Sequence, residues 1–166
     1  MQRKTEVLKD YITQAFLSLM ENKGFHAISI KEITKKAGVN RSTYYRNFNS
    51  KNDIIKYYFD KLHNEYYVKS DISKITDVNT IYNLFNHYYK YKTELLLIHK
   101  NGLSYLILDS LNEIFKITTK EQTFSETYKL YFYAGGIFNI LLLWLSNDMK
   151  NKTRHISEFN SILFSE

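Results

Sequence analysis

The scarcity of helix-breaking residues restricts the folds open to this chain. Its 166 residues include no proline and only five glycines, so little in the sequence interrupts a helix. Alternation of apolar and polar residues, which is typical of half-buried strands, is also scarce. The 15 tyrosines and 11 phenylalanines supply enough apolar surface for a folded core. These features predict an all-α fold.

The N-terminal region contains the clearest amphipathic helix. Its apolar residues recur as adjacent pairs every four positions: Val7, Leu8, Tyr11, Ile12, Ala15, Phe16, Leu19 and Met20. Gly24 follows the last pair, and glycine readily takes the left-handed conformation that ends helices. We therefore expect Gly24 to end the first helix.

Three polar residues stand where further short helices are expected to begin: Ser29, Asn40 and Ser50. Glu32 lies three residues after Ser29 and completes a capping-box pattern. The predicted second and third helices cover about 30–36 and 41–47, and a fourth begins at Lys51.

The remainder of the chain predicts longer helices, for a total of about nine. The first of these begins at Thr76 or Asp77, after a loop over 70–78. Thr93 is the expected cap of the next, which Gly102 closes. The other predicted ranges are about 94–100, 103–117, 121–146 and 153–164.

Small and apolar residues within 30–50 have the spacing of a helix-turn-helix. Ala37 and Gly38 can form a tight turn where two helices nearly touch. Ile33, Tyr44 and Phe48 can lock the second helix across the first. The polar residues left on the outer face are suited to bases and phosphates: Arg41, Ser42, Tyr45 and Arg46. An ordinary charged helical hairpin is the alternative.

The positive charge is concentrated at the N-terminal end. Residues 1–66 hold 12 basic and 7 acidic side chains, a net charge of +5, whereas residues 67–166 hold 11 and 10, a net charge of +1. A basic block on a nearly neutral remainder indicates a head that binds a polyanion and a body with another task.

Several other classes of protein are disfavoured. The absence of cysteine excludes thiolate metal sites, disulfides and cysteine catalysis. The five histidines show no metal-binding spacing, and no catalytic motif is present, so we expect no enzyme activity, cofactor or metal. The N-terminus lacks the apolar core of a secretion signal. The apolar run over 131–145 is shorter than the roughly 20 residues of a membrane span, so we expect a cytoplasmic protein.

The segment AGVNRSTYYRNFNSKNDII resembles the signature of the TetR family of bacterial helix-turn-helix transcriptional regulators. The matching positions within it are Thr43, Tyr45, Phe48, Ser50, Lys51 and Asp53. Earlier matches are Ala15, Phe16, Gly24-Phe25 and the run from Ser29 to Ile33. The resemblance covers about residues 5–60. It implies a helix-turn-helix domain over 1–50 and a helical effector-binding and dimerisation domain over 51–166.

The resemblance also implies roles for individual residues in the head. Phosphate contacts are expected from Thr43, Tyr45 and Lys51. Contacts to base edges are expected from Arg41 and Ser42, with Tyr44 or Arg46 as further options. Ser29 and Lys31 would meet the DNA backbone. Asn47 stands where histidine is commoner, and Arg46 adds a charge beside it, so the readout differs from the usual pattern.

The sequence over 131–145, YFYAGGIFNILLLWL, is apolar all round, and we expect it to be buried on more than one side. Its two glycines suggest a close approach of another backbone. By the resemblance, the last two helices pair with their mates in a homodimer, and an intramolecular core helix is the alternative. The expected interface residues are Tyr131, Ala134, Gly135, Phe138, Leu142, Leu145, Phe159 and Leu163.

The family fold places an effector cavity among the helices of the body, where aromatic and histidine side chains abound. The candidate ligand residues are Tyr58, Tyr66, His87, Tyr88, His99 and Tyr105. Aromatic residues at helical spacing also fill cores, and this alternative stays open.

The resulting prediction is a dimeric repressor released from a palindromic operator in double-stranded DNA by a small-molecule effector. One alternative is an activator or co-regulator that responds to a protein partner. Another is a ligand-binding protein whose head no longer binds DNA.

Overall fold

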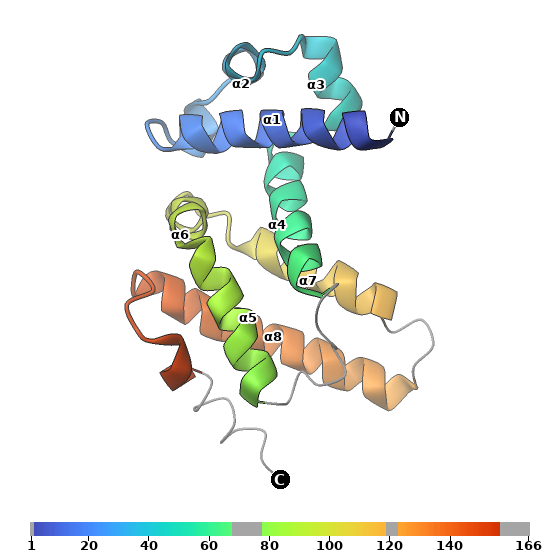
Figure 1. The fold of residues 1–166 in the computed structure, drawn as a ribbon, viewed down its shortest axis with the longest axis vertical. Helices are drawn as coiled ribbons and strands as arrows, with labels where there is room; N and C mark the ends of the chain where they lie inside the picture. Colours follow the sequence, from blue (N-terminus) through green and yellow to red (C-terminus); the bar gives the residue numbers. More distant parts are fainter. Residues whose placement is uncertain (1, 68–77, 119–122, 157–166) are drawn as a thin grey trace. The chain divides into compact units, whose positions relative to one another are not determined.

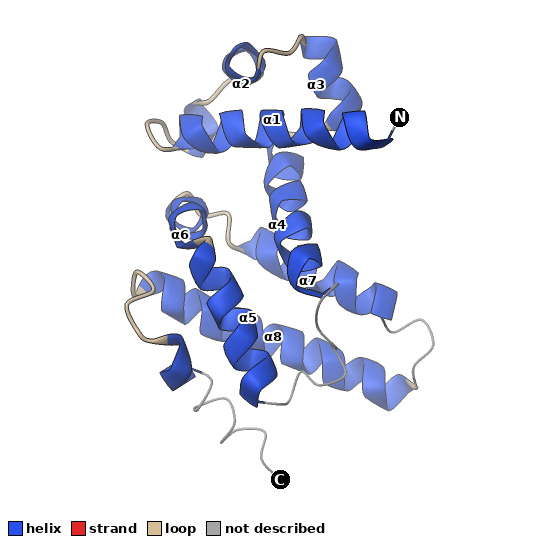
Figure 2. Ribbon diagram, in the orientation of Figure 1, coloured by secondary structure: helices blue, strands red, loops and turns tan. Residues whose placement is uncertain are grey.

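The computed structural model describes residues 2–67, 78–118 and 123–156, and all regular secondary structure in these ranges is helical (Figures 1 and 2). The predicted all-α fold is confirmed. The chain divides into two compact units, Met1–Phe59 and Asp60–Glu166. They are called here the head and the body, and each is described by itself.

The head contains α1 (Gln2–Met20), the short 3-10 helix η1 (Phe25–Ala27), α2 (Ile30–Ala37), α3 (Arg41–Asn47) and the first turns of α4 (Lys51–Tyr67). The helix α1 packs against α2 and α3 (Figure 1). Apolar side chains from all four α-helices form one core, in which each is at most 3% exposed: Ile12, Phe16, Ile33, Tyr44, Phe48, Ile54 and Ile55.

All three predicted N-caps of the head are confirmed. The Ser29 hydroxyl accepts a hydrogen bond from the Glu32 amide, and Glu32 completes the capping box. The Asn40 side chain accepts one from the Thr43 amide at 2.7 Å. The Ser50 hydroxyl accepts one from the amide of Asp53 at 3.2 Å. Each helix begins here because a short polar side chain satisfies an amide that lacks an intrahelical partner.

The expected ending of the first helix is wrong. The helix α1 ends at Met20, and Gly24 has an extended backbone (φ −63°, ψ 150°) that leads into η1. Gly24 is therefore the N-cap residue of η1 and not a left-handed C-cap of α1.

The boundary between the two units falls inside α4, whereas the predicted domains meet before it. The first turns of α4 belong to the head because Tyr57 donates a hydrogen bond to Asp10 Oδ1 of α1 at 3.1 Å. The Tyr57 ring also packs against Phe48 at 5.9 Å, and Lys9 lies over both rings.

The body contains α5 (Val78–Lys90), α6 (Lys92–Lys100), α7 (Tyr105–Thr118) and α8 (Phe124–Ser146) together with the last turns of α4. The helix α8 packs against α6 and α7. Residues 153–156 are helical again.

Two helix N-termini in the body differ from the prediction. Thr93 lies inside α6, and α8 is capped by Thr123 with Glu126 in a capping box. The predicted loop over 70–78 lies outside the described residues except for Val78, which begins α5, and the predicted last helix lies outside them beyond residue 156.

The expectation that 131–145 is buried on more than one side is wrong for the single chain. Along α8 the buried side chains follow one face: Leu130, Ala134, Ile137, Leu141, Trp144 and Leu145. On the opposite face Phe132 is 70% exposed and Leu143 is 66% exposed. One side of α8 therefore covers the core of the body, and the other leaves large apolar side chains uncovered.

The length of the apolar run over 131–145 does not exclude a membrane span, because this run is part of the longer helix α8, which has 23 residues. Among the described helices it is long and apolar enough to cross a membrane, with a mean hydropathy of 1.3 over its most apolar 18 residues. One helix of this kind is weak evidence, and a third of that window is buried against the rest of the body.

Candidate nucleic-acid interface

The turn between α2 and α3 depends on a single backbone conformation. Gly38 has φ +66° and ψ 28°, the left-handed region that side chains with a Cβ disfavour. This turn lets the Val39 amide donate to the Thr34 carbonyl at 3.0 Å, which closes the end of α2. The buried Ile33 and Tyr44 side chains then fix α3 across α2, as predicted.

The outward face of α3 is polar and cationic. Arg41, Ser42, Tyr45 and Arg46 are all exposed, and the Tyr45 ring is 55% exposed despite its size. The structure thus brings these four predicted DNA-binding residues together on one face of one helix. Such a face offers guanidinium, hydroxyl and phenol groups, which bind base edges and phosphate oxygens.

Hydrogen bonds within α3 orient the groups around this face. Arg46 Nη2 donates to Thr43 Oγ1 at 3.1 Å, and Asn47 Nδ2 donates to the Thr43 carbonyl at 2.7 Å. The Ser42 hydroxyl donates to Asn40 Oδ1 at 2.8 Å. Thr43 and Asn47 are half-buried, so they lie at the edge of the exposed face and not at its centre.

The option that Tyr44 reaches a DNA groove is wrong, because its side chain is fully buried. Its ring packs against Phe48 at 6.2 Å and Tyr45 at 5.3 Å. Burial, followed by the charge of Asp53, raises the pKa of Tyr44 to about 12. Its hydroxyl has no hydrogen-bond partner among the described residues.

Lys51 has an intramolecular role that the sequence did not suggest. Its ammonium donates to the carbonyls of Phe25 at 2.7 Å and Ile28 at 2.9 Å, and a longer contact of 3.4 Å reaches His26. It also lies 4.6 Å from the centre of the Phe25 ring. Burial lowers the pKa of Lys51. The phosphate contact expected of Lys51 stays a prediction, and the side chain already joins α4 to the segment before α2.

The first turn of α2 contains the other two predicted DNA-binding residues, Ser29 and Lys31, and both are exposed. The Ser29 side chain already takes part in the capping box, whereas Lys31 is exposed in the first turn.

Glu32 forms an ion pair with Lys23. That pairing, followed by hydrogen bonds from Ser29, lowers the pKa of Glu32 from 4.5 to about 2.

Four of the six candidate ligand residues are buried: Tyr58, which lies in the head, and Tyr66, His87 and Tyr88, which lie in the body. The Tyr66 hydroxyl donates to the Thr80 carbonyl at 2.7 Å. His87 Nε2 lies 2.8 Å from the Leu62 carbonyl. The polar atoms of Tyr66 and His87 therefore have partners inside the protein, as core residues do.

A buried polar chain also joins three helices of the body. The Ser110 hydroxyl donates to Asp60 Oδ1 at 2.6 Å, and His63 Nδ1 lies 2.9 Å from that hydroxyl. His63 Nε2 lies 3.0 Å from the Tyr88 hydroxyl. Burial, followed by the effect of His87, lowers the pKa of His63 from 6.5 to about 3. Local sequence patterns do not predict this polar network, because Ser110 and Tyr88 lie 25 to 50 residues from their partners Asp60 and His63.

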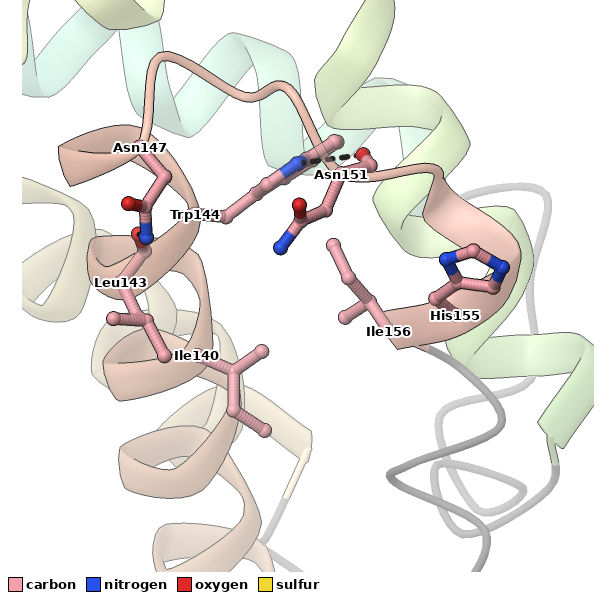
Figure 3. Close-up of a pocket in the computed structure, with 7 residues that line it drawn as sticks. All are labelled: Ile140, Leu143, Trp144, Asn147, Asn151, His155 and Ile156. Atoms are coloured by element: carbon pink, nitrogen blue, oxygen red, sulfur yellow. Dashed lines mark hydrogen bonds between the residues drawn. The ribbon is translucent and has the colours of Figure 1, made fainter.

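The other two candidates lie elsewhere in the body. His99 Nδ1 is 2.9 Å from the Ser104 hydroxyl, and Tyr105 is 48% exposed. A cavity of about 270 Å³ lies near the end of α8, and none of the six candidates lines it. Figure 3 shows Ile140, Leu143 and Trp144 on one side of this cavity and Ile156 on the other.

The predicted interface residues fall into three groups. Ala134 and Leu145 are buried inside the body, so they cannot contact a partner without rearrangement. Tyr131 is exposed, and three residues are partly exposed: Gly135, Phe138 and Leu142. Phe159 and Leu163 lie outside the described residues.

Metal-binding clusters of three or more His, Asp or Glu side chains do not occur among the residues that the structure describes.

Three comparisons with known proteins each find similar proteins. Residues 12–58 match the model for bacterial regulatory proteins of the tetR family. A stretch of 96 residues is 26% identical to the HTH-type dhaKLM operon transcriptional activator DhaS of Lactococcus lactis subsp. lactis (strain IL1403). That match covers 58% of this chain but only 43% of the relative.

The third match is to a solved structure, the fatty acid degradation regulator FadR from Bacillus halodurans. It covers 95% of this chain and 94% of that one, with a TM-score of 0.57 and 21% sequence identity. This likeness concerns the fold. The match to the family model spans α2, the glycine turn and α3, the part of the head that carries the exposed polar face. The head of this chain therefore contains a DNA-binding domain of the type found in bacterial regulatory proteins of the tetR family.

Proposed function

We propose that the protein is a dimeric transcriptional regulator that binds a palindromic operator in double-stranded DNA through α3. The observation that carries this proposal is the exposed face of α3, where Arg41, Ser42, Tyr45 and Arg46 gather on a helix held by a capped turn. The exposed arginines disfavour the alternative of a head that no longer binds DNA, since they have no role in the core of the head.

Dimerisation follows from the size of the reading element. The seven residues of α3 span about 10 Å, which covers only a few base pairs. Two such helices about 34–36 Å apart read successive major grooves of a palindrome. The uncovered apolar face of α8 supports a homodimer, because Phe124, Phe132 and Leu143 are each at least 66% exposed in the single chain.

The response of the regulator is proposed to pass through α4. This helix is continuous from Lys51, in the head, to Tyr67, in the body. An effector that binds the body and prefers one position of α4 would change the affinity of the heads for DNA. Repression relieved by a small molecule is the first form of the proposal. Activation is the second, because the relative from Lactococcus lactis is a transcriptional activator. A regulator of this kind acts in the cytoplasm, and we propose no enzyme activity for it.

The test begins with selection of binding sequences from a random duplex pool by the full chain. Fluorescence anisotropy then compares the selected palindrome with a single half-site at several salt concentrations. We expect the palindrome to bind at least about 100-fold more tightly. The slope of log affinity against log salt should reach about −0.9 for each phosphate contact. Equal affinity for half-site and palindrome would rule out the dimeric reading.

Two variants sharpen this test. Arg41→Ala should change which bases are preferred, since an arginine bonded to a base edge discriminates by a factor of about ten or more. Lys90→Ala removes an exposed lysine of the body and serves as the matched control, with unchanged affinity and preference. If Arg41→Ala leaves the selected sequence unchanged, Arg41 does not read bases.

A further inference from the structure

A second cavity in the body, of about 340 Å³, lies between α5 and the segment that follows α8. Its α5 side is formed by Tyr82, Asn86 and Tyr89, which lie on one helical face because they are spaced four and three residues apart. The other side is formed by residues 150–154, with the sequence KNKTR. None of the six candidate ligand residues lines this cavity.

The segment after α8 is held in place by contacts from three helices. The Trp144 indole donates to the Asn151 carbonyl at 3.0 Å, and the Lys92 ammonium donates to the Met149 carbonyl at 3.3 Å. The Thr153 hydroxyl donates to Asn86 Oδ1 at 2.7 Å. The wall of the cavity is therefore built by specific hydrogen bonds.

The same segment contains two consecutive residues in an uncommon conformation. Asp148 has φ +54° and Met149 has φ +52°, although neither is glycine. Met149 is only 1% exposed, so its side chain anchors the turn in the core. The strain of two left-handed residues persists because the surrounding contacts over-determine it.

The cavity has an excess of positive charge. Between 148 and 154 stand three basic side chains, Lys150, Lys152 and Arg154, and one acidic one, Asp148, for a net charge of +2. Lys150 pairs with Asp148 at 3.2 Å. Hydrogen bonding and the charge of Lys150, with smaller effects of Lys100 and Lys92, lower the pKa of Asp148. The cationic surroundings of the segment thus extend to α6.

We propose that this cavity binds a small phosphate monoester, such as a sugar phosphate. The basic side chains that line the cavity, Lys150, Lys152 and Arg154, can complement the charge of a phosphate monoester, about −1.5 to −2 near neutral pH. The guanidinium of Arg154 suits the phosphate oxygens, and Lys152 adds a second charge. The amides of Asn86 and Asn151 and the hydroxyl of Tyr82 can bind a hydroxylated body, and the volume lies in the range of small-molecule sites. This site is separate from α3 and does not depend on DNA binding.

The chain has a built-in reporter of this site, since Trp144 is its one tryptophan. The Trp144 ring stacks on Tyr89 at 5.9 Å, and its indole bonds Asn151, so ligand binding next to it should change its fluorescence. The experiment titrates the full chain at fixed ionic strength with ribose 5-phosphate, inorganic phosphate and ribose. Isothermal calorimetry checks each affinity.

We expect saturable binding of ribose 5-phosphate, at least about tenfold weaker binding of inorganic phosphate and no response to ribose. Lys152→Gln and Arg154→Gln should each weaken binding by about tenfold or more. Both side chains are exposed, so neither change should unfold the chain, which circular dichroism verifies. The control is Lys129→Gln, an exposed lysine eighteen residues before Asn147 and thus about 27 Å away along α8.

Three results would overturn the proposal. The first is no saturable response to any phosphate compound by fluorescence or calorimetry. The second is equal loss of affinity in Lys129→Gln and Arg154→Gln, which would indicate non-specific attraction. The third is an effect of Arg154→Gln on duplex DNA affinity without any sugar-phosphate binding, which would assign the cluster to nucleic acid. Because the fluorescence and calorimetric titrations contain no DNA, their failure is distinct from failure of the proposed DNA binding.

Discussion

The helices α3 and α8 each bury one face and expose the other, but they expose opposite chemistry. The exposed face of α3 carries Arg41, Tyr45 and Arg46, whereas that of α8 carries Phe132 and Leu143. Both helices have fully buried side chains on the other face, Tyr44 in the head and Leu141 in the body.

This contrast teaches how to assign partners to the two regions. A solvated polar face carries no penalty in water, so only its residue types indicate a polyanion. A large uncovered apolar face does carry one, and it indicates a protein surface that covers it. The predictions below test whether the head binds DNA through α3 and the body binds a protein surface through α8.

The largest effect is expected from a charge on the exposed face of α8. Phe132→Asp should raise the dissociation constant of the homodimer by at least about thirtyfold, since it places a carboxylate where an aromatic ring is covered. Sedimentation velocity over a concentration series measures the change. The matched control is Ser125→Asp, at an exposed polar position of the same helix. A dimer that survives Phe132→Asp unchanged would remove α8 from the interface.

Lys51→Ala tests whether Lys51 contributes mainly to the stability of the head or mainly to DNA binding. Its removal leaves the carbonyls of Phe25 and Ile28 without this donor, and we expect a loss of about 2 kcal/mol in the free energy of unfolding. Urea denaturation measures it. Lys35→Ala, at an exposed position near the end of α2, should change stability by less than about 0.5 kcal/mol. Equal stabilities of the two variants, with weaker DNA binding only for Lys51→Ala, would assign Lys51 to phosphate alone.

Two glycine substitutions compare the head and the body directly. At Gly38 an added Cβ would meet nothing within 4 Å, so Gly38→Ala has only the cost of φ +66°, about 1 kcal/mol. At Gly135 the space is also open, but the backbone is helical, so Gly135→Ala should stabilise an isolated chain by up to about 1 kcal/mol.

The pair of glycine variants also probes the interface. If a partner backbone approaches α8 at Gly135, the added methyl should weaken the dimer while it stabilises the monomer. Thermal unfolding at low and high protein concentration separates the two effects. At low concentration we expect changes in thermal stability of opposite sign for Gly38→Ala and Gly135→Ala, because only Gly38 has a left-handed backbone. A stabilising Gly38→Ala would contradict this explanation.

The smallest effect concerns acid. Folding lowers the pKa of Glu32 from 4.5 to about 2, so its charged form stabilises the head fully above pH 4.5, and this contribution is lost as the pH falls toward 2. Glu32→Gln should therefore unfold with less dependence on pH in that window, as seen by circular dichroism. The control is Glu21→Gln, an exposed glutamate near the end of α1. A pH dependence identical in Glu32→Gln and the natural chain would show that the capping box does not hold the carboxylate.

Local signals predicted the head almost completely. The caps at Ser29, Asn40 and Ser50 were correct because each hydrogen bond joins residues only three positions apart. The role of Lys51 was missed because the carbonyls that it contacts lie 23 to 26 residues earlier. In the body, long-range bonds such as His63 to Ser110, 47 residues apart, gave no local pattern at all.

The sequence by itself determined the helical class, the glycine turn and the residues on the outer face of α3, since these depend on propensity and on spacing within a few turns. Only the tertiary structure decided which face of α8 is covered, that Ala134 and Leu145 lie in the core, and that KNKTR closes a cationic cavity beside α5. The physical reason is that burial is a property of the elements that pack together. The sequence of a helix that is apolar on all sides, such as the 131–145 part of α8, does not indicate which side its neighbours will cover.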